Sequence, residues 1–519
     1  MGMLETLLLA VSLAVTLVFF AYGFNIFYLL RLSRKYRKPA PLSASKPTIA
    51  IHLPIFNERY VAERLLQACS VTADLYGKDK VHVSVLDDSD DETTSMLMEV
   101  TEDYRAKGFN FDVQHRDDRS GFKAGALNAA LLKAKEEFVV VFDSDFLPRP
   151  DFLDRAAAYV TADDSLGVVQ FRWSYTNRDY NWITKAVSIG MDAHFMIEQP
   201  ARCAGGLFLN FNGSGGIIRT GALKESGGWQ SDTLAEDLDA SYRMQLKRYR
   251  IQYVSDDVPC EIPPTVASFK RQQGRWARGS LQVAKKSLPS LLIDRKVSLK
   301  QKFEAFIHLT YYSVHPLMYT SFLLAALAAI FNVDSIKVVI PSPTQIGQAA
   351  GGKLSGLSWT TPLWVLFGLS ILLCTAAAWV YYIVAMRRQH ISVLGNWRSL
   401  LALGFLGYGI SVSNTLEALK AFLLKGSGVF KRTPKYAVVG TEGTWKDKKY
   451  QVPLEYTSFL EALSVLVAAV AIGRAVAFDN LGIIIILGVY AFAYVFVFST
   501  TISQSGKENM VPAVQAGLH

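Results

Sequence analysis

The chain has 519 residues, half of them hydrophobic, and a formal net charge of +9. It is too long for one ordinary domain, and its apolar content excludes an ordinary soluble enzyme. The apolar residues are segregated into long runs, which predicts a membrane protein with a separate soluble part. No aromatic–basic RNA motif accompanies the positive charge, so we expect anionic lipid headgroups, and no nucleic acid, as its partners.

The first apolar run, residues 7–30, is long enough to cross a bilayer. A cleaved signal peptide fits less well, because Glu5 is the only charge ahead of the run and no small-residue cleavage site precedes the basic residues. The positive-inside tendency places the basic end in the cytoplasm and the amino terminus outside. The basic residues that follow the run are Arg31, Arg34, Lys35, Arg37 and Lys38.

Five further apolar runs follow, at 307–332, 359–386, 400–424, 457–477 and 480–500. If all five crossed the membrane, the seven basic residues between positions 425 and 449 would lie outside, against the positive-inside tendency. The run 400–424 carries polar residues at helical spacing, so we predict an amphipathic helix in the cytoplasmic interface. This leaves five spanning helices and a cytoplasmic carboxyl terminus. The polar residues are Ser411, Ser413, Asn414, Glu417 and Lys420.

Residues 46–298 predict a cytoplasmic α/β domain with a mixed, mainly parallel sheet flanked by helices. The segments 48–53 and 81–86 are rich in β-formers, and they alternate with the helical stretches 61–75 and 124–135. The four cysteines lack metal-ligand or redox spacing, so we expect free thiols. They are Cys69, Cys203, Cys260 and Cys374.

Acidic residues follow two of the predicted strands. The segment 87–91 reads D-D-S-D-D, and its mutual repulsion is costly unless a cation or hydrogen-bond donor is bound. The uninterrupted apolar run 139–142 suits a buried parallel strand, and it leads directly to Asp143 and Asp145. Ligands collect at the carboxyl ends of such strands, where two carboxylates can reach a divalent cation held by a diphosphate. An ordinary acidic surface turn is the alternative.

Two other polar segments precede the D-x-D. Lys123 lies in the first turn of a predicted helix, against the macrodipole preference, which makes sense if it faces an anion such as phosphate. Gly121 and Gly125 allow close backbone approach there, and a solvated lysine is the alternative. The turn 54–58, P-I-F-N-E, is best explained by its residues alone as a cap for the following helix.

The second half of the domain carries different chemistry. The glycine-rich loop 211–216 lacks the spacing of a dinucleotide fingerprint, so we reject a Rossmann cofactor. Glu236 and Asp237 open a predicted helix, where acids by themselves indicate ordinary capping. The segment 271–279, R-Q-Q-G-R-W-A-R-G, combines guanidinium groups that can bind phosphate with an indole that can stack on a sugar. An interfacial cationic helix is the alternative.

As an ordered set, these motifs resemble the processive inverting glycosyltransferases of family 2, in the cellulose synthase superfamily. The phrases G-F-K-A-G-A-L, F-D-S-D-F, F-N-G-S-G-G and Q-Q-G-R-W look most like the cellulose-synthase-like A and C group, which includes β-mannan and glucomannan synthases. The resemblance is close over residues 48–288 and extends to the later spans only in architecture. It implies a GT-A-type catalytic domain.

The resemblance also implies roles for individual residues. Asp237 would be the catalytic base of a T-E-D motif, although Ala235 stands where the family often has Thr. Asp143 and Asp145 would bind Mg²⁺ or Mn²⁺, and the nucleobase would lie near Asp87. The residues that would bind the nucleotide-sugar are Pro54, Asn57, Glu58, Asp87, Asp88, Lys123, Asp143 and Arg275, and those that would bind the acceptor are Glu236, Gln272 and Trp276.

The implied activity is processive transfer of hexose to a β-1,4-mannan or glucan that the helices carry across a plasma or Golgi-type membrane. GDP-mannose is the favoured donor and UDP-glucose the second. Segment 425–450 loosely matches the family's gating loop, through Phe430, Thr433 and Lys435. The predicted organisation is an anchor over 1–38, the catalytic domain over 46–298 and a channel-forming region over 299–519. Transfer to a membrane lipid, and a nucleotide-binding transporter or receptor, remain alternatives.

Overall fold

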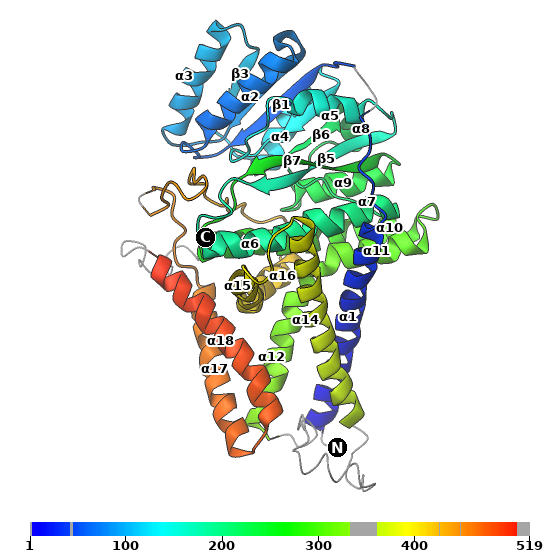
Figure 1. Cartoon of the computed structure of the whole chain (residues 1–519), viewed down its shortest axis with the longest axis vertical. Helices are drawn as coiled ribbons and strands as arrows, with labels where there is room; N and C mark the ends of the chain where they lie inside the picture. The colour runs from blue at the N-terminus through cyan, green and yellow to red at the C-terminus, as the bar shows by residue number, and fades with distance from the viewer. Residues whose placement is uncertain (1–2, 42–44, 333–360, 425, 447, 506–519) are drawn as a thin grey trace.

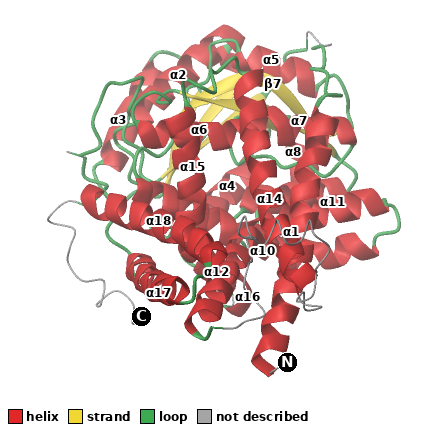
Figure 2. Ribbon diagram, turned by 60° about the horizontal axis from the view of Figure 1, so that its bottom comes forward, coloured by secondary structure: helices red, strands yellow, loops and turns green. Residues whose placement is uncertain are grey.

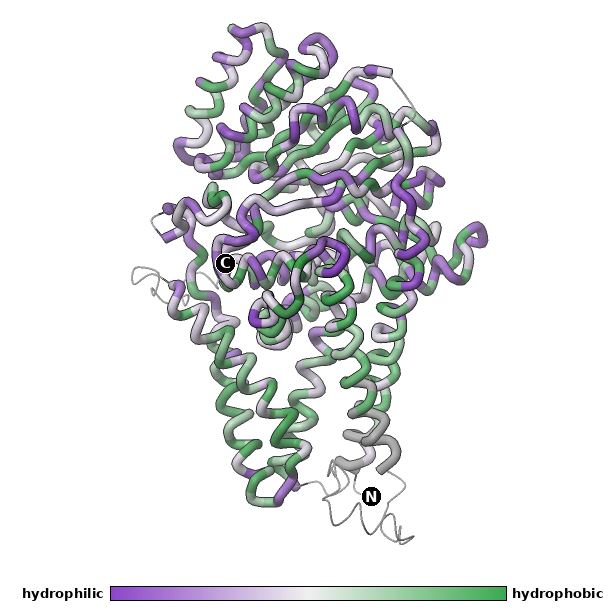
Figure 3. Tube along the Cα trace, in the orientation of Figure 1, coloured by the Kyte–Doolittle hydropathy of each residue, from purple (hydrophilic) through white to green (hydrophobic). Residues whose placement is uncertain are grey.

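The computed structural model describes residues 3–41, 45–332, 361–424, 426–446 and 448–505. An α/β domain lies at one end of the molecule and a bundle of long helices at the other (Figure 1). Hydrophobic residues dominate the bundle, whereas the α/β domain is mixed (Figure 3). The hydrophobic residues are therefore concentrated in the helix bundle.

Seven strands of the described chain form one sheet, in the order β3-β2-β1-β4-β6-β5-β7. Strand β6 is antiparallel to both of its neighbours, and the other strand pairs are parallel. The predicted mixed, mainly parallel sheet is therefore confirmed. The strands are β1 (Ile49–Ile55), β2 (Val81–Asp87), β3 (Phe111–His115), β4 (Phe138–Val141), β5 (Leu166–Tyr175), β6 (Gly216–Arg219) and β7 (Arg250–Cys260).

Alternating side chains of the central strands bury both faces of the sheet. Ile49 and Ile51 pack into one core with helices α2 and α5, whereas Ala50 and Val139 pack into a second core with α4, α8 and α9. This two-sided burial explains why the central strands are almost continuously apolar. The flanking helices are α2 (Ala62–Tyr76), η1 (Lys78–Lys80), α3 (Thr93–Ala106), α4 (Phe122–Lys133), α5 (Phe152–Val160), α8 (Thr220–Glu225) and α9 (Glu236–Leu246).

A layer of helices lies between the sheet and the bundle (Figures 1 and 2). The long helix α10 contacts α9 of the α/β domain and also contacts α11 and α16, so it connects the two parts. The helices of this layer are α6 (Trp182–Ala193), the π-helical turn η2 (His194–Glu198), α7 (Gln199–Gly205), α10 (Val266–Ile293), α11 (Leu299–Thr310), η3 (Tyr311–Ser313), α15 (Trp397–Gly409) and α16 (Ser411–Leu423).

Within the described residues, four helical segments are long and apolar enough to cross a membrane. They match four of the five predicted spans. The fifth, 359–386, begins outside the described residues and continues as α14 (Thr361–Arg388), which packs beside α1. The four segments are Ala10–Ser33 in α1 (Met3–Ser33), Leu299–Ile330 ending in α12 (Val314–Ile330), α17 (Thr457–Ala477) and α18 (Leu481–Gln504).

The run 400–424 forms two helices, so the prediction of one continuous helix is wrong. Helices α15 and α16 meet at Ile410 with a bend of 45°. The bend follows Gly407 and Gly409, which favour helix less than other residues, and the absence of a side chain at Gly409 lets α15 approach α18 closely. The polar face is also buried within the protein, because Asn414 is fully enclosed. The interfacial location stays a prediction, since the pair could also form one broken span.

Candidate active site

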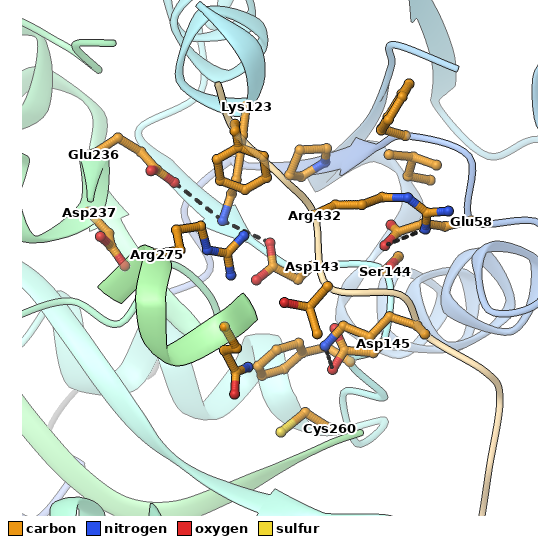
Figure 4. Close-up of a pocket in the computed structure, with 18 of the residues that line it drawn as sticks. Glu58, Lys123, Asp143, Ser144, Asp145, Glu236, Asp237, Cys260, Arg275 and Arg432 are labelled. Atoms are coloured by element: carbon orange, nitrogen blue, oxygen red, sulfur yellow. Dashed lines mark ion pairs between the residues drawn. The ribbon is translucent and has the colours of Figure 1, made fainter. Parts of the chain in front are cut away.

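A pocket lies at the carboxyl ends of β1, β2 and β4, opposite the start of α9 and the face of α10. It has a volume of about 150 Å³. The chain between α16 and α17, residues 426–446 and 448–456, passes over it and is called the crossing segment below. All of the predicted site residues except Asn57 and Asp87 line this pocket. Asp237, Glu236 and Arg275 lie on one side, and Glu58 and Arg432 lie on the other (Figure 4).

Each acid of the D-x-D is paired with a lysine. Asp143 Oδ1 lies 2.8 Å from Lys123 Nζ, and Asp145 Oδ2 lies 2.9 Å from Lys435 Nζ in the crossing segment. The backbone N–H of Glu261 also donates to Asp145 Oδ2. The two carboxylates therefore face the pocket, as predicted, and their charge is balanced by cations from two distant parts of the chain.

The two carboxylates fit a divalent cation that takes its other ligands from a substrate. Asp145 Oδ1 is buried and has no hydrogen-bond partner among the described residues, so one hard oxygen is available at the bottom of the pocket. No group of three or more acidic, His or Cys side chains in the described chain could hold a metal by itself. Asp143 and Asp145 can therefore complete a metal site together with diphosphate oxygens.

Asp237 stands at the start of α9, beside the glycine-rich loop. A Cβ at Gly213, where φ is +80°, would lie only 2.7 Å from Asp237 Oδ2, so this position requires glycine. Burial, together with the charge of Glu236, raises the pKa of Asp237 to about 7 against the opposing charge of Lys123. Glu236 and Asp237 also lie in the first turn of α9, where Asp237 Oδ1 accepts the backbone N–H of Leu238, so a capping contribution coexists with their position in the pocket. Asp237 is thus a carboxyl group suited to exchange a proton near neutral pH.

Lys123 is the cation that connects the acids. Gly121 adopts a left-handed conformation, φ +71°, immediately before α4, and this turn aims the first turn of the helix at the pocket. The Lys123 ammonium lies 3.4 Å from Glu236 Oε1 and donates to the carbonyl of Gly213. Burial lowers the pKa of Lys123, but the carboxylates of Asp143 and Glu236 outweigh it, so the pKa is raised. Lys123 therefore keeps its positive charge and lies in the pocket, where it was expected to face a phosphate.

Helix α10 presents Gln272, Arg275 and Trp276 to the pocket. Positions three and four residues apart share one helix face, so these side chains lie together. The guanidinium of Arg275 stacks on Phe430 of the crossing segment, with 4.5 Å between the guanidinium carbon and the ring centroid. Burial lowers the pKa of Arg275, although Glu236 opposes the shift. A cation and an indole therefore lie together where α10 lines the pocket, which is called the acceptor side below because the resemblance implies that Gln272 and Trp276 bind the acceptor.

The acidic segment after β2 is neutralised within the protein. Asp87 is fully buried and accepts hydrogen bonds from the Ser89 N–H, the Thr94 hydroxyl and His115 Nδ1. Asp88 lines the pocket, and both of its oxygens lie 2.7 Å from donors of Arg116. Asp87 therefore holds the loop in place, while Asp88 is the acid that faces the pocket.

The turn 54–58 does not cap α2 with its side chains, so the capping interpretation is wrong. The N-cap residue is Val61, which makes no side-chain capping bond, and the backbone carbonyl of Glu58 accepts instead. Asn57, at φ +52°, bonds to Asp90 and so joins the two polar loops. Glu58 enters the pocket, where burial raises its pKa to about 7 despite the opposing charge of Arg432.

Several pocket residues escaped the sequence prediction. Glu261 follows β7, and an acid at a strand's carboxyl end was an available signal. Arg432 reaches Glu58 at 3.7 Å, but nothing local predicts a contact across more than 370 positions. Phe56 lies within the turn 54–58 and Arg119 lies two residues before Gly121, but the sequence assigns neither of them a role. All four line the pocket.

Two family models match the chain. The model described as "Glycosyl transferase family 2" matches residues 50–225, and the model described as "Glycosyl transferase family group 2" matches residues 138–387. Together they span more than half of the chain, from the first strand of the sheet into α14. They therefore include the D-x-D, the start of α9 and the pocket face of α10.

Two curated plant proteins are similar to this chain. Glucomannan 4-beta-mannosyltransferase 2 of Arabidopsis thaliana is 35% identical over 266 residues, 50% of this chain and 49% of that protein. Glucomannan 4-beta-mannosyltransferase 1 of Oryza sativa subsp. japonica is 34% identical over 271 residues, 51% of each. The matches thus span about half the length of these curated relatives.

Among solved structures, the mannosyltransferase PcManGT from Pyrobaculum calidifontis, in complex with GDP-Man and Mn²⁺, is similar with a TM-score of 0.48 and 22% identity. The similarity covers 71% of this chain and 98% of that one. The sheet described above is itself the mixed, mainly parallel sheet of a GT-A-type domain. Since both family models match and the expected motifs lie in one pocket, the chain contains a glycosyltransferase domain of family 2.

Proposed function

We propose that this chain transfers mannose from GDP-mannose, with inversion, to the end of a growing β-mannan, and that its helices carry the product across the membrane. The observation that carries the proposal is the position of Asp237. Its pKa of about 7 suits a general base, and it shares one pocket with the D-x-D, Arg275 and Trp276. The similarity to glucomannan 4-beta-mannosyltransferases supports mannose as the transferred sugar.

The reaction is a direct displacement. Asp237 accepts the proton of the acceptor hydroxyl as that oxygen forms a bond to the anomeric carbon. The bond from the anomeric carbon to the diphosphate oxygen breaks, and its electron pair leaves with the nucleotide. Attack from the face opposite the leaving group converts an α-linked donor into a β-linked product.

The leaving diphosphate needs positive charge. Lys123 and Arg275 lie within the pocket, and both stand close to Asp143 and Glu236, so they can neutralise the charge that develops on phosphate. A Mg²⁺ or Mn²⁺ ion held by Asp143 and Asp145 would add Lewis-acid stabilisation of the same charge. Trp276 offers an apolar face on which the terminal sugar of the acceptor can stack.

The crossing segment supports a gating role. Its residues contact the pocket at Asp145, Glu58 and Glu261, and farther along Lys449 pairs with Glu92 at 2.9 Å. The pocket volume of about 150 Å³ is below the roughly 300 Å³ at which ligand sites begin. A nucleotide-sugar therefore requires the segment to shift, and Lys435 to leave Asp145 if a metal binds there.

Passage of a polymer is supported by the position of the acceptor side. Gln273, on α10 next to Gln272, accepts a hydrogen bond from the hydroxyl of Tyr312 at 3.1 Å. Tyr312 lies in η3, directly before α12, so the acceptor side of the pocket adjoins the helix bundle. A glycan that leaves Trp276 would meet these helices first.

The test is donor turnover by the purified full chain in nanodiscs, with Mg²⁺ or Mn²⁺ and a mannan oligosaccharide acceptor. GDP-mannose and UDP-glucose are offered separately, and the released nucleotide is measured. The proposal predicts acceptor-dependent release of GDP. Turnover of UDP-glucose alone would overturn the proposed donor while leaving the displacement chemistry intact.

A further inference from the structure

The end of the pocket remote from Asp237 is rich in arginine. The guanidinium of Arg119 lies 3.3 Å from the ring centroid of Phe56, and the guanidinium of Arg432 lies 5.8 Å from the same centroid. Asp88 lines this end as well. Since Lys123, Asp143 and Arg275 gather at the other end with Asp237, where the sugar and diphosphate are expected, this end is the place for the nucleobase.

The acceptors of the two polar loops at this end are already engaged. Both oxygens of Asp88 are bound by Arg116, and Asp87 is buried beneath it with its own three donors. Asn57 Oδ1 accepts from the backbone N–H of Asp90. A base that must donate an N–H here would therefore have to break a charge-assisted pair.

The donors, in contrast, are available. The side chain of Arg119 makes no hydrogen bond or ion pair with any described residue, and its Nε is buried without an acceptor. Arg432 Nη1 also makes no hydrogen bond in the described chain, although it forms an ion pair with Glu58 at 3.7 Å. The guanidinium of Arg119, which stacks on the Phe56 ring, is a planar group of N–H donors without a hydrogen-bond acceptor in the described chain.

We propose that Arg119 reads the O6 and N7 edge of guanine, so that this end of the pocket selects a guanine nucleotide. Guanine presents two acceptors side by side on that edge, which match the donor fork of arginine. Adenine places a donor beside N7, and uracil separates its two carbonyl groups with an N–H that needs an acceptor. This inference rests on the proposed function and extends it, because it gives a physical reason for GDP over UDP.

The test removes the arginine and the base atom in turn. Binding of GDP, 7-deaza-GDP and UDP to the full chain in detergent is measured by titration calorimetry, for wild type and Arg119→Ala. 7-Deaza-GDP keeps the phosphates and O6 but lacks the N7 acceptor. We expect wild type to prefer GDP to both other nucleotides by about tenfold, and Arg119→Ala to weaken GDP about tenfold and the other two less than twofold. Arg119→Lys, which keeps the charge but not the fork, should not restore the preference.

The outcomes separate this inference from the proposed function. Equal weakening of all three nucleotides by Arg119→Ala would assign Arg119 to phosphate and overturn the inference alone. A wild-type preference for GDP that no Arg119 variant changes would do the same. A wild-type preference for UDP would overturn both the inference and the proposed donor. Thermal unfolding reports whether each variant is folded. If Arg119→Ala does not fold, the same binding measurements are made with Arg119→Gln.

Discussion

The proposed displacement depends most on a single residue, Asp237. Asp237→Asn keeps the shape of the side chain but cannot accept the proton, so turnover should fall by about 10²- to 10⁴-fold. Binding of GDP, measured by titration calorimetry, should be unchanged. The control is Asp232→Asn, an exposed acid ahead of α9 that pairs with Lys286. Wild-type turnover in Asp237→Asn would exclude Asp237 as the base.

The pH dependence should report the raised pKa of Asp237. The base acts only when deprotonated, so turnover should rise with pH through about 7 and fall roughly tenfold per unit below it. The charge of Glu236 contributes to the raised pKa, so Glu236→Gln should move this limb to lower pH, whatever it does to the maximal rate. Glu58 also has a pKa of about 7, and Glu58→Gln is the matched control. If Glu58→Gln moves the limb and Glu236→Gln does not, Asp237 is not the titrating group.

At the residue scale, the sequence predicts which strand ends carry acids but not what they contact. The acidic segment after β2 was expected to need a cation or a hydrogen-bond donor, and the structure supplies His115 and Arg116 from within the chain. Asp87 and His115 are direct neighbours in the β2–β3 pairing, and this register is invisible in a linear sequence. The acids after β4 were recognised more easily because a buried apolar strand leads straight into them.

The crossing segment is the element whose role is most open to test. Phe430 stacks on Arg275 and also on Phe122, so Phe430→Ala and Thr433→Ala should each lower turnover, about tenfold for Phe430. The adjacent Val429 is 68% exposed, and Val429→Ala should have no effect. Turnover under saturating donor is the measurement. If Phe430→Ala and Thr433→Ala both leave it unchanged, the gating role is lost.

At the element scale, the hydrophobic pattern predicts most strands and helices. A strand buried on both faces is continuously apolar, and a helix buried on one face has apolar residues at helical spacing. The break at Ile410 was missed because two helices of about equal length leave the same pattern as one. The contacts of Arg432 and Lys435 could not be predicted either. They depend on how α16 and α17 pack, and that packing brings a distant segment over the sheet.

The catalytic domain and the bundle are joined by a buried ion pair. Lys270 of α10 and Glu461 of α17 lie 2.5 Å apart, with 8% and 0% of their side chains exposed. Glu461→Leu should lower the free energy of unfolding by about 3–5 kcal/mol, because it leaves an uncompensated buried charge. The double variant with Lys270→Met should recover most of that loss. Thermal unfolding in detergent measures the stability of the single and double variants. An equal loss of stability in the double variant would show that the uncompensated charge of Lys270 is not the cause of the destabilisation.

At the scale of the whole molecule, the apolar runs predict the helices of the bundle well. A helix that can cross a bilayer is recognised from the length and apolar composition of its own segment, without knowledge of its neighbours. The same argument does not decide whether α15 and α16 lie in the interface or enter the membrane, because α16, which carries the polar residues, packs against α10 and buries most of them. The path of the product depends on the same packing.

The central claim is polymerisation of mannose in β linkage, and the product tests it most directly. The full chain in nanodiscs is incubated with GDP-[¹⁴C]mannose and a divalent cation, and the labelled product is sized before and after digestion with an endo-β-1,4-mannanase. We predict a polymer that the enzyme reduces to short oligosaccharides, and no product from Asp237→Asn. Label that partitions entirely into organic solvent, or a polymer that resists the mannanase, would contradict the claim.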